Sequence, residues 1–144
     1  MERVIIFIIL ALCMFCVKPA FGEEGTNLSN LITAQNIKYQ DCTKVFNIDN
    51  INLLYLTIAS INANRFTVDE IQSRNGYVIF TAVNKKFLAT ITNVNTNQAM
   101  LKITPVDNNY YFQPGIYLNI FKYIDLNLRN KAENIYFTEN QSNN

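Results

Sequence analysis

The chain has 144 residues, of which 49% are hydrophobic, and its formal net charge is +1. It contains no histidine and only four glycines, and neither glycine-rich phosphate-binding motif occurs in it. Serine triads, cysteine–histidine dyads and histidine metal sites are therefore excluded in their usual forms. The size suits one domain with a single hydrophobic core, and no linker rich in proline or glycine divides it.

The first 22 residues are predicted to be a cleaved export signal. Val4–Val17 is an uncharged apolar run that follows Arg3, which is the pattern of a signal peptide. A membrane-spanning helix needs about 20 apolar residues. Lys18 and Pro19 end this run earlier, so the run is too short to span a membrane comfortably.

Cleavage is expected before Glu23, because Ala20-Phe21-Gly22 places small residues at the two positions that a signal peptidase recognises. The alternative is an uncleaved N-terminal anchor, through which alone the protein would contact a membrane. A lipoprotein signal is disfavoured because large residues, Leu12 and Phe15, precede the two cysteines of the run. In each case the rest of the chain faces away from the cytosol, in the periplasm, in the cell envelope or outside the cell.

Cleavage would remove two of the 12 basic residues and one of the 11 acidic residues, which leaves ten of each and no net charge. Lys85-Lys86 is the only adjacent basic pair that remains, so we expect no nucleic-acid partner. We expect no cofactor and no metal either. Cys42 is the one cysteine that remains, and it is either buried and inert, free, or bonded to another chain.

Residues 23–48 are predicted to be a partly ordered N-terminal segment, with one or two helical turns within Leu28–Ile37. The first strong helical pattern begins at Asp49 or Asn50, either of which suits an N-cap, and ends at Asn62-Ala63-Asn64. Its apolar residues have helical spacing: Ile51, Leu54, Tyr55, Ile58 and Ile61. Further leucines widen this stripe, so we expect the helix to be largely covered by other structure.

Four strands are predicted next, because segments rich in Val, Ile, Thr, Phe and Tyr are separated by short runs of turn residues. They are Phe66–Ser73, Tyr77–Val83, Phe87–Val94 and Ala99–Pro105. Asn75-Gly76 predicts a hairpin with a type I′ turn. Alternate residues of a strand share a face, so Leu101 and Ile103 lie on an apolar face and Lys102 on a mixed one.

A second helix is predicted from Ile116 or Tyr117 to Leu128, with one apolar side. We therefore expect an α+β fold of two layers, in which a four-stranded antiparallel meander is covered by an N-terminal and a C-terminal helix. This domain would span residues 49–137. Residues 138–144 are polar and would form a disordered tail.

Asp69-Glu70 is the only adjacent acidic pair inside a predicted element. Two carboxylates suffice to hydrolyse a glycosidic bond, but neighbours on a strand point to opposite faces unless a bulge intervenes. An exposed edge strand or a bulged strand near Arg65 and Arg74 accounts for the pair without catalysis. Cys42 is disfavoured as a nucleophile because it would need a nearby base, and the only local candidates are Lys38, Asp41 and Lys44.

The candidate residues for binding a ligand or a partner are aromatic and lie at the end of the chain's patterned part: Tyr110, Tyr111, Phe112, Tyr117 and Tyr123. Tyrosine combines a large apolar area with a polar tip and is common in binding sites. The alternative is that these rings belong to the core or anchor the last helix. If some of them are exposed beside a groove, a peptide, a glycan or an apolar ligand is expected.

The leading hypothesis is therefore an exported, non-enzymatic module that binds a partner protein or a small ligand in the cell envelope or outside the cell. The second hypothesis is a carboxylate-dependent hydrolase or lyase with an atypical site that lacks histidine. A third is self-association, in which an exposed sheet edge pairs with another copy or with a partner strand.

Overall fold

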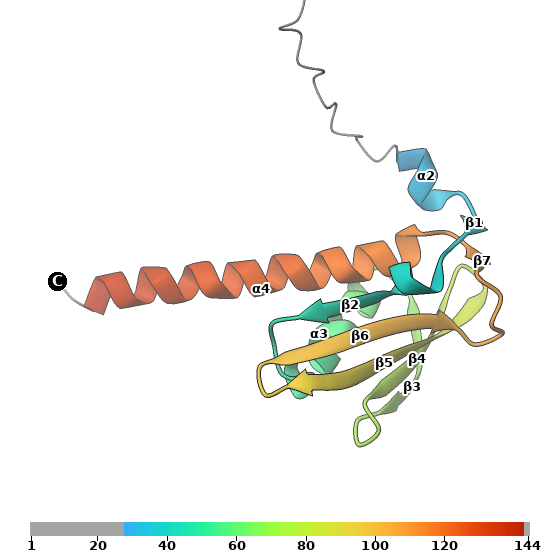
Figure 1. The fold of residues 1–144 in the computed structure, drawn as a ribbon. Helices are drawn as coiled ribbons and strands as arrows, with labels where there is room; N and C mark the ends of the chain where they lie inside the picture. The colour runs from blue at the N-terminus through green and yellow to red at the C-terminus, as the bar shows by residue number, and fades with distance from the viewer. Residues whose placement is uncertain (1–27, 143–144) are drawn as a thin grey trace, which may run out of the picture.

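The computed structural model describes the backbone of residues 28–142 and the side chains of residues 28–130 (Figure 1). Residues 1–27 and 143–144 lie outside the described residues. The predicted signal 1–22 and its alternatives fall there and stay predictions. Within the described part of the chain, no helix is both long enough and apolar enough to cross a membrane.

The fold is α+β, as predicted. Its elements are α2 (Leu28–Ile32), β1 (Gln35–Asn36), the 3₁₀ helix η2 (Tyr39–Cys42), β2 (Thr43–Phe46), α3 (Asn50–Ala63), β3 (Thr67–Gln72), β4 (Tyr77–Ala82), β5 (Lys85–Asn95), β6 (Gln98–Pro105), β7 (Tyr111–Phe112) and α4 (Gly115–Ser142). A five-stranded antiparallel sheet has the order β2-β6-β5-β4-β3, and β1 pairs with β7 in a separate two-stranded sheet (Figure 1).

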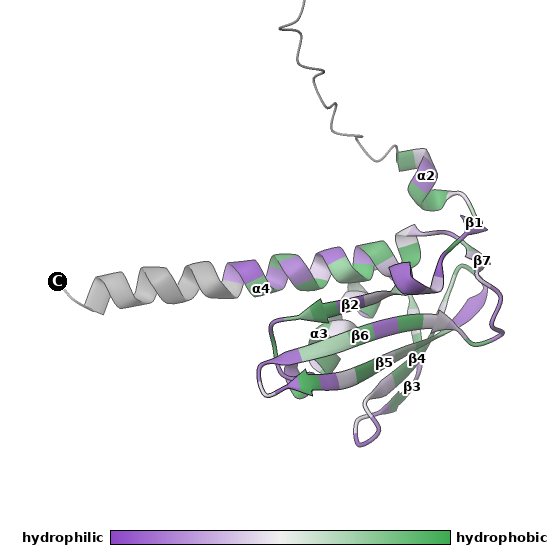
Figure 2. Cartoon of the chain, in the orientation of Figure 1, coloured by the Kyte–Doolittle hydropathy of each residue, from purple (hydrophilic) through white to green (hydrophobic). Residues whose placement is uncertain are grey.

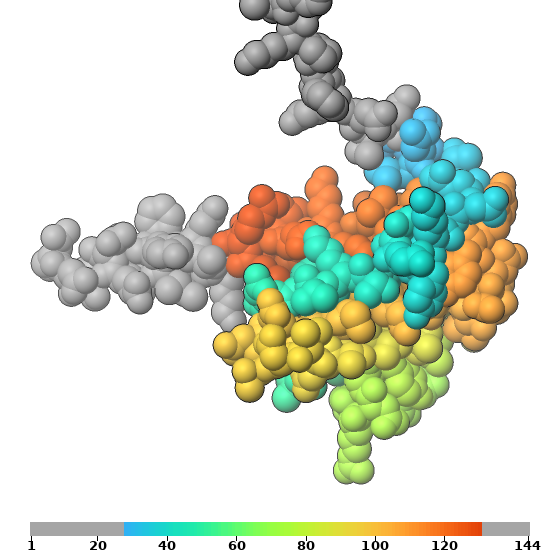
Figure 3. Space-filling model, in the orientation of Figure 1, coloured from blue at the N-terminus to red at the C-terminus, as the bar shows by residue number. Residues whose placement is uncertain are grey.

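The predicted meander is present as β3 to β6, but the prediction of four strands is wrong. The fifth strand, β2, pairs antiparallel with β6, with Thr43 opposite Lys102 and Phe46 opposite Ala99. It is only four residues long and its partner is remote in the sequence, so no local pattern marks it. In Figure 3 the segment from β1 to β2 lies between α4 and the hairpin of β5 and β6.

Helix α3 has the predicted boundaries because both ends are capped. The Asp49 carboxylate accepts a hydrogen bond from the backbone N–H of Asn52 at 3.0 Å, which makes Asp49 the N-cap. After the last turn, Arg65 takes a positive φ of 59°, and the N–H of Phe66 donates to the carbonyl of Ile61 at 3.1 Å. This is the Schellman ending of a helix, with arginine at the position where glycine is usual.

The core lies between the helices and one face of the sheet. Helix α3 lies against β3, β4, β5 and β6, whereas α4 packs alongside α3 and reaches β2 through Phe121, whose ring lies 6.0 Å from that of Phe46. The expectation that both helices cover the four-stranded meander is thus corrected, because α3 lies against its strands and α4 packs mainly on α3. The fully buried apolar side chains include Leu53, Ile61, Val78, Phe80, Phe87, Leu101, Ile103, Ile120 and Ile124.

The turn after β3 is not of the predicted type, and the turn after β4 is the one with positive φ at both of its residues. The turn after β3 spans residues 73–76, and of these only Gly76 has a positive φ, of 65°. Asn75-Gly76 is therefore not a type I′ turn, which needs positive φ at both central residues. The two-residue turn is Val83-Asn84, with φ of 48° and 60°, between Ala82 and Lys85.

Neither α3 nor α4 covers the opposite face of the sheet, whose side chains are half-buried or exposed. Hydropathy alternates along β5 and β6, as Figure 2 shows. Thr90 stands between Tyr77 and Lys102 in one row across the strands, and Leu88 stands between Ile79 and Thr104 in the next. We call this surface the open face.

Helix α4 extends beyond the predicted end at Leu128 and runs to Ser142. It therefore includes residues 138–142 of the predicted tail, and residues 143–144 lie outside the described part. Both β1 and β2 belong to the predicted N-terminal segment 23–48, and each pairs with a strand from the predicted domain 49–137.

Candidate functional site

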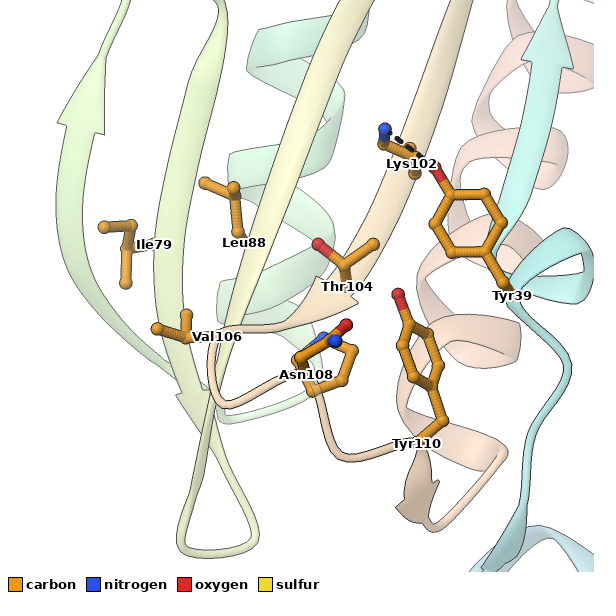
Figure 4. A pocket seen from close by; sticks show the side chains of 9 residues that line it. Tyr39, Ile79, Leu88, Lys102, Thr104, Val106, Asn108 and Tyr110 are labelled. Carbon is orange, nitrogen blue, oxygen red and sulfur yellow. Dashed lines mark hydrogen bonds between the residues drawn. The ribbon is translucent and has the colours of Figure 1, made fainter.

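An open hollow of about 410 Å³ lies on the open face, near the end of β6 (Figure 4). Ligand sites are usually concave, mostly apolar and furnished with a few converging polar groups. The residues that line this hollow are Tyr39, Ile79, Leu88, Lys102, Thr104, Pro105, Val106, Asn108 and Tyr110. They come from η2, β4, β5, β6 and the loop after β6, so the complete fold is needed to assemble them.

Two tyrosines form one wall of the hollow. The rings of Tyr39 and Tyr110 meet edge to face, with centroids 6.0 Å apart and planes at 69°. The small β1–β7 sheet brings their segments together, and the N–H of Ile37 donates to the carbonyl of Tyr110 at 2.9 Å. In Figure 4 both hydroxyl groups point toward the space between Lys102 and Thr104.

Among the described residues that line the hollow, Lys102 is the only charged one. Its Nζ donates a hydrogen bond to Tyr39 Oη at 3.0 Å and lies 5.5 Å from the centroid of the same ring. Two lysines of the described side chains form ion pairs, Lys44 with Asp125 and Lys85 with Asp107. Within that same set of side chains, Lys102 has no carboxylate partner within 4.0 Å.

The floor of the hollow is aliphatic. Ile79 on β4 is the register neighbour of Leu88 on β5, and Leu88 is that of Thr104 on β6. The loop after β6 closes one end, where Val106 donates its N–H to a strand carbonyl and Asn108 adopts a φ of 56°. The hollow therefore combines an apolar floor with hydroxyl, amide and ammonium groups on its rim (Figure 4).

The structure divides the predicted aromatic cluster. Tyr110 lines the hollow, and burial of its phenol is the main cause that raises its pKa. Phe112 and Tyr117 belong to the core, with 4% and 6% of their surfaces exposed. Tyr111 is 56% exposed, and Tyr123 lines a separate groove beside the end of α3.

A chain of ring contacts nevertheless joins three members of that cluster. Tyr110 lies 6.4 Å from Phe112, and Phe112 lies 6.4 Å from Tyr117, between ring centroids. Burial raises the pKa of Tyr117 to about 12, and the nearby groups of Cys42 and Asp41 add to the shift. Tyr117 is thus an anchor of α4, whereas Tyr110 faces the open side.

Sequence reasoning missed Tyr39 as a site residue. It lies in a segment without hydrophobic periodicity and meets Tyr110 only through long-range pairing. Lys102 was assigned to the mixed face of its strand, which is correct, but the local pattern does not show that two tyrosines flank it. The alternation of apolar and polar residues along β6 is the one sequence signal that could have indicated that Lys102 belongs to the candidate site.

The acidic pair occupies a bulge in the edge strand β3. The register of β3 against β4 shifts between Val68 and Glu70. Asp69 accepts a hydrogen bond from Thr81 at 2.7 Å, and Glu70 accepts one from Tyr77 at 3.0 Å. Thr81 and Tyr77 share the open face, so the bulge places both carboxylates on it, but neither lines the hollow.

Cys42 is buried and forms no disulfide. Burial, followed by the charge of Asp41, raises the pKa of its thiol to about 11, which disfavours the reactive thiolate. Among the described residues, no group of three or more cysteines, aspartates and glutamates could hold a metal ion.

A second groove, of about 440 Å³, lies between α2, β2 and α4. Its charged residues are two lysines and two aspartates, and the pair Lys44–Asp125 spans it. Because its charges are balanced, this groove offers less to a charged ligand than the hollow does.

No protein-family model and no curated protein matches the chain. The function is therefore argued from the residues of the hollow.

Proposed function

We propose that the protein is a small exported, non-enzymatic module that binds its ligand in the hollow of the open face. Export rests on the predicted signal 1–22, and its place of action would be the cell envelope or the space outside the cell. The observation that carries the proposal is the lining of the hollow. An aliphatic floor, two tyrosines and one lysine without a carboxylate partner within the described part of the chain are suited to holding a molecule.

The size of the hollow supports a small ligand or one side chain of a partner. Ligand pockets usually measure about 300–1,000 Å³, and this hollow has about 410 Å³. The ring of Tyr110 packs on Tyr39 and on Phe112, so it is held by neighbours before any ligand arrives. A wall that is already ordered loses less conformational entropy on binding.

A carboxylate-dependent hydrolase is the second candidate, because the bulge in β3 brings Asp69 and Glu70 to one face. Glycoside hydrolysis needs one carboxyl group with a raised pKa beside a second, ionised one, both facing the scissile bond. Here both carboxylates belong to exposed residues of the edge strand, accept hydrogen bonds from the neighbouring strand β4 and lie outside the hollow. Binding therefore has the better support.

Self-association through a sheet edge has less support at β3. A bulge and charged side chains are features by which proteins prevent edge strands from pairing, and β3 has both at Asp69-Glu70. The opposite edge, β2, has only four residues. Sedimentation that shows growing particles at rising concentration would contradict this reasoning.

The proposal can be tested by nuclear magnetic resonance on the exported protein. Three classes of probe would be titrated, namely medium-chain fatty acids, N-acetyl dipeptides and short oligosaccharides. We expect at least one class to shift the backbone amides of Ile79, Leu88 and Asn108 in a saturable way. Hydrolysis of an oligosaccharide that Glu70→Gln abolishes would favour the second candidate instead.

Adjacent tyrosines provide the matched control. Tyr110→Ala removes a wall of the hollow, whereas Tyr111→Ala removes an exposed ring that does not line it. We expect the first variant to weaken binding about tenfold or more, and the second to change it less than about twofold. Equal binding by both variants would show that the ligand binds elsewhere.

A further inference from the structure

The hollow has an imbalance of charge that points to the kind of ligand it takes. Within the described side chains, Lys102 is the only charged residue that lines the hollow, and the hydrogen-bond partner of its ammonium group is the neutral phenol of Tyr39. An ammonium group is stabilised more by an anion than by a neutral phenol, because the attraction of opposite charges adds to the hydrogen bond. The hollow therefore complements a single negative charge.

The neighbours of Lys102 are also donors. The hydroxyl groups of Tyr39 and Tyr110 point toward the same space, whereas the hydroxyl group of Thr104 points to the other side, toward Leu88 (Figure 4). A carboxylate has two oxygens with about four acceptor positions in total, so it can use several of these groups at once. The lysine and the two phenols thus form a cradle for one carboxylate.

The rest of the hollow is aliphatic. Ile79, Leu88 and Val106 line it, and the last of these is 56% exposed. Covering such side chains with an apolar group is favourable in proportion to the apolar area removed from water. A ligand with both a carboxylate and an aliphatic portion would satisfy the two parts of the hollow together.

The backbone around the hollow argues against an extended peptide. Strands β4, β5 and β6 are all paired with strands on both sides, so their N–H and C=O groups are used within the sheet. A peptide lying on this face would find no strand edge with which to pair its own backbone. A simple aliphatic acid has no such groups to satisfy.

We infer that the hollow binds a small aliphatic carboxylic acid, with its carboxylate held by Lys102, Tyr39 and Tyr110 and its aliphatic portion on Ile79, Leu88 and Val106. This inference rests on the proposed function and assigns a ligand class to the same site. Neutral molecules of the same shape should bind more weakly, and so should acids without an apolar portion.

The test compares four probes on the exported protein by titration calorimetry and amide chemical shifts. Hexanoate is the expected ligand, hexanamide lacks the charge, acetate lacks the aliphatic portion, and N-acetyl-leucyl-alanine presents a peptide carboxylate. We expect hexanoate to bind about tenfold or more tightly than hexanamide or acetate, because each of these loses one of the two interactions. It should also bind more tightly than the peptide.

Two lysines on the open face supply the matched variants. Lys102→Met should weaken hexanoate binding about tenfold and change hexanamide binding less than about twofold. Lys86→Met, on the same face but outside the hollow, should change neither. Tyr39→Phe, which removes one hydroxyl and keeps the ring, should weaken hexanoate binding by a smaller factor.

Three outcomes would overturn the inference. The first is that hexanoate and hexanamide bind equally tightly. The second is that neither Lys102→Met nor Tyr39→Phe changes hexanoate binding, and the third is that the peptide binds more tightly than hexanoate. In each of these cases the proposed function still holds if the bound probe shifts the amide resonances of the hollow and Tyr110→Ala weakens its binding. If instead every probe that binds leaves the amides of the hollow unshifted, the proposed function fails together with the inference.

Discussion

The two faces of the five-stranded sheet use alternate residues of the same strands, yet they have different surroundings. On the covered face, Phe80, Phe87 and Leu101 are fully buried under the helices. On the open face, Leu88 and Lys102 are only partly buried, and neither α3 nor α4 lies over them. Since neighbouring residues point to opposite sides, one strand can hold the core with half of its side chains and leave the other half free for a ligand.

The largest expected effect is a difference between two leucines of adjacent strands. Leu101→Ala opens a cavity on the covered face and should lower the free energy of unfolding by about 2–5 kcal/mol. Leu88→Ala, on the open face, should lower it by about 1 kcal/mol or less, because less apolar surface is buried there. Urea unfolding of both variants measures the difference. Equal losses would show that the open face is covered in solution.

The distinction between the faces also requires a fixed register, because a slip of one residue would exchange them. Gly76→Ala tests this at the first turn. Alanine would need a positive φ, and its Cβ would lie 2.7 Å from the carbonyl oxygen of Ile91. We expect a loss of about 2 kcal/mol in the free energy of unfolding. Ser73→Ala, in the same turn, should cost less than about 0.5 kcal/mol.

A substitution in the second turn, Val83-Asn84, should raise the free energy of unfolding instead of lowering it. Val83 is a β-branched residue with a φ of 48°, which is unfavourable, whereas asparagine tolerates this conformation. Val83→Asn should therefore raise the free energy of unfolding by about 1 kcal/mol. Val106→Asn is a control with the same 56% exposure but without a positive φ, and it should give no gain. A gain in both variants would point to lost surface hydrophobicity as the cause.

The smallest effect at neutral pH concerns a buried and an exposed tyrosine. The pKa of Tyr117 is raised to about 12, above about 10 for an unfolded chain. Because the pKa is raised, the contribution of the neutral Tyr117 phenol to the free energy of unfolding is fully present below pH 10 and is lost as the pH rises toward 12. Tyr117→Phe should reduce this alkaline loss, and Tyr111→Phe should keep it, as measured by urea unfolding between pH 9 and pH 12. Parallel profiles for the two variants would exclude this linkage.

Local patterns predicted much of the fold. The helical spacing that begins at Asp49 locates α3, and the alternation around Leu101 assigns the two faces correctly. These features depend on residues that are close in the sequence, and their physical causes, a cap and a period of two, act locally.

Features formed by distant segments were not predicted. Strand β2 has four residues and is a strand only because β6 lies beside it. The prediction of a type I′ turn at Asn75-Gly76 was wrong for a related reason. The pairing of the strands imposes positive φ on Val83 in the other turn, although valine does not favour it.

The candidate site was predicted in part. The run Tyr110-Tyr111-Phe112 lies near the end of β6, but successive residues of an extended segment point in different directions. Only Tyr110 therefore reaches the hollow. Its partners Tyr39 and Lys102 come from other parts of the chain, and no spacing rule connects them.

The Tyr39–Tyr110 contact also has a consequence for the order of folding. Tyr39 precedes the meander and Tyr110 follows it, and the β1–β7 pairing that joins their segments closes a loop around the whole sheet. Contacts between such distant segments form late, because the chain entropy of closing a long loop must be overcome first. A chain that ended before β7 would lack the strand pairing that holds Tyr110 beside Tyr39, so this wall of the hollow is complete only when the whole domain has been made.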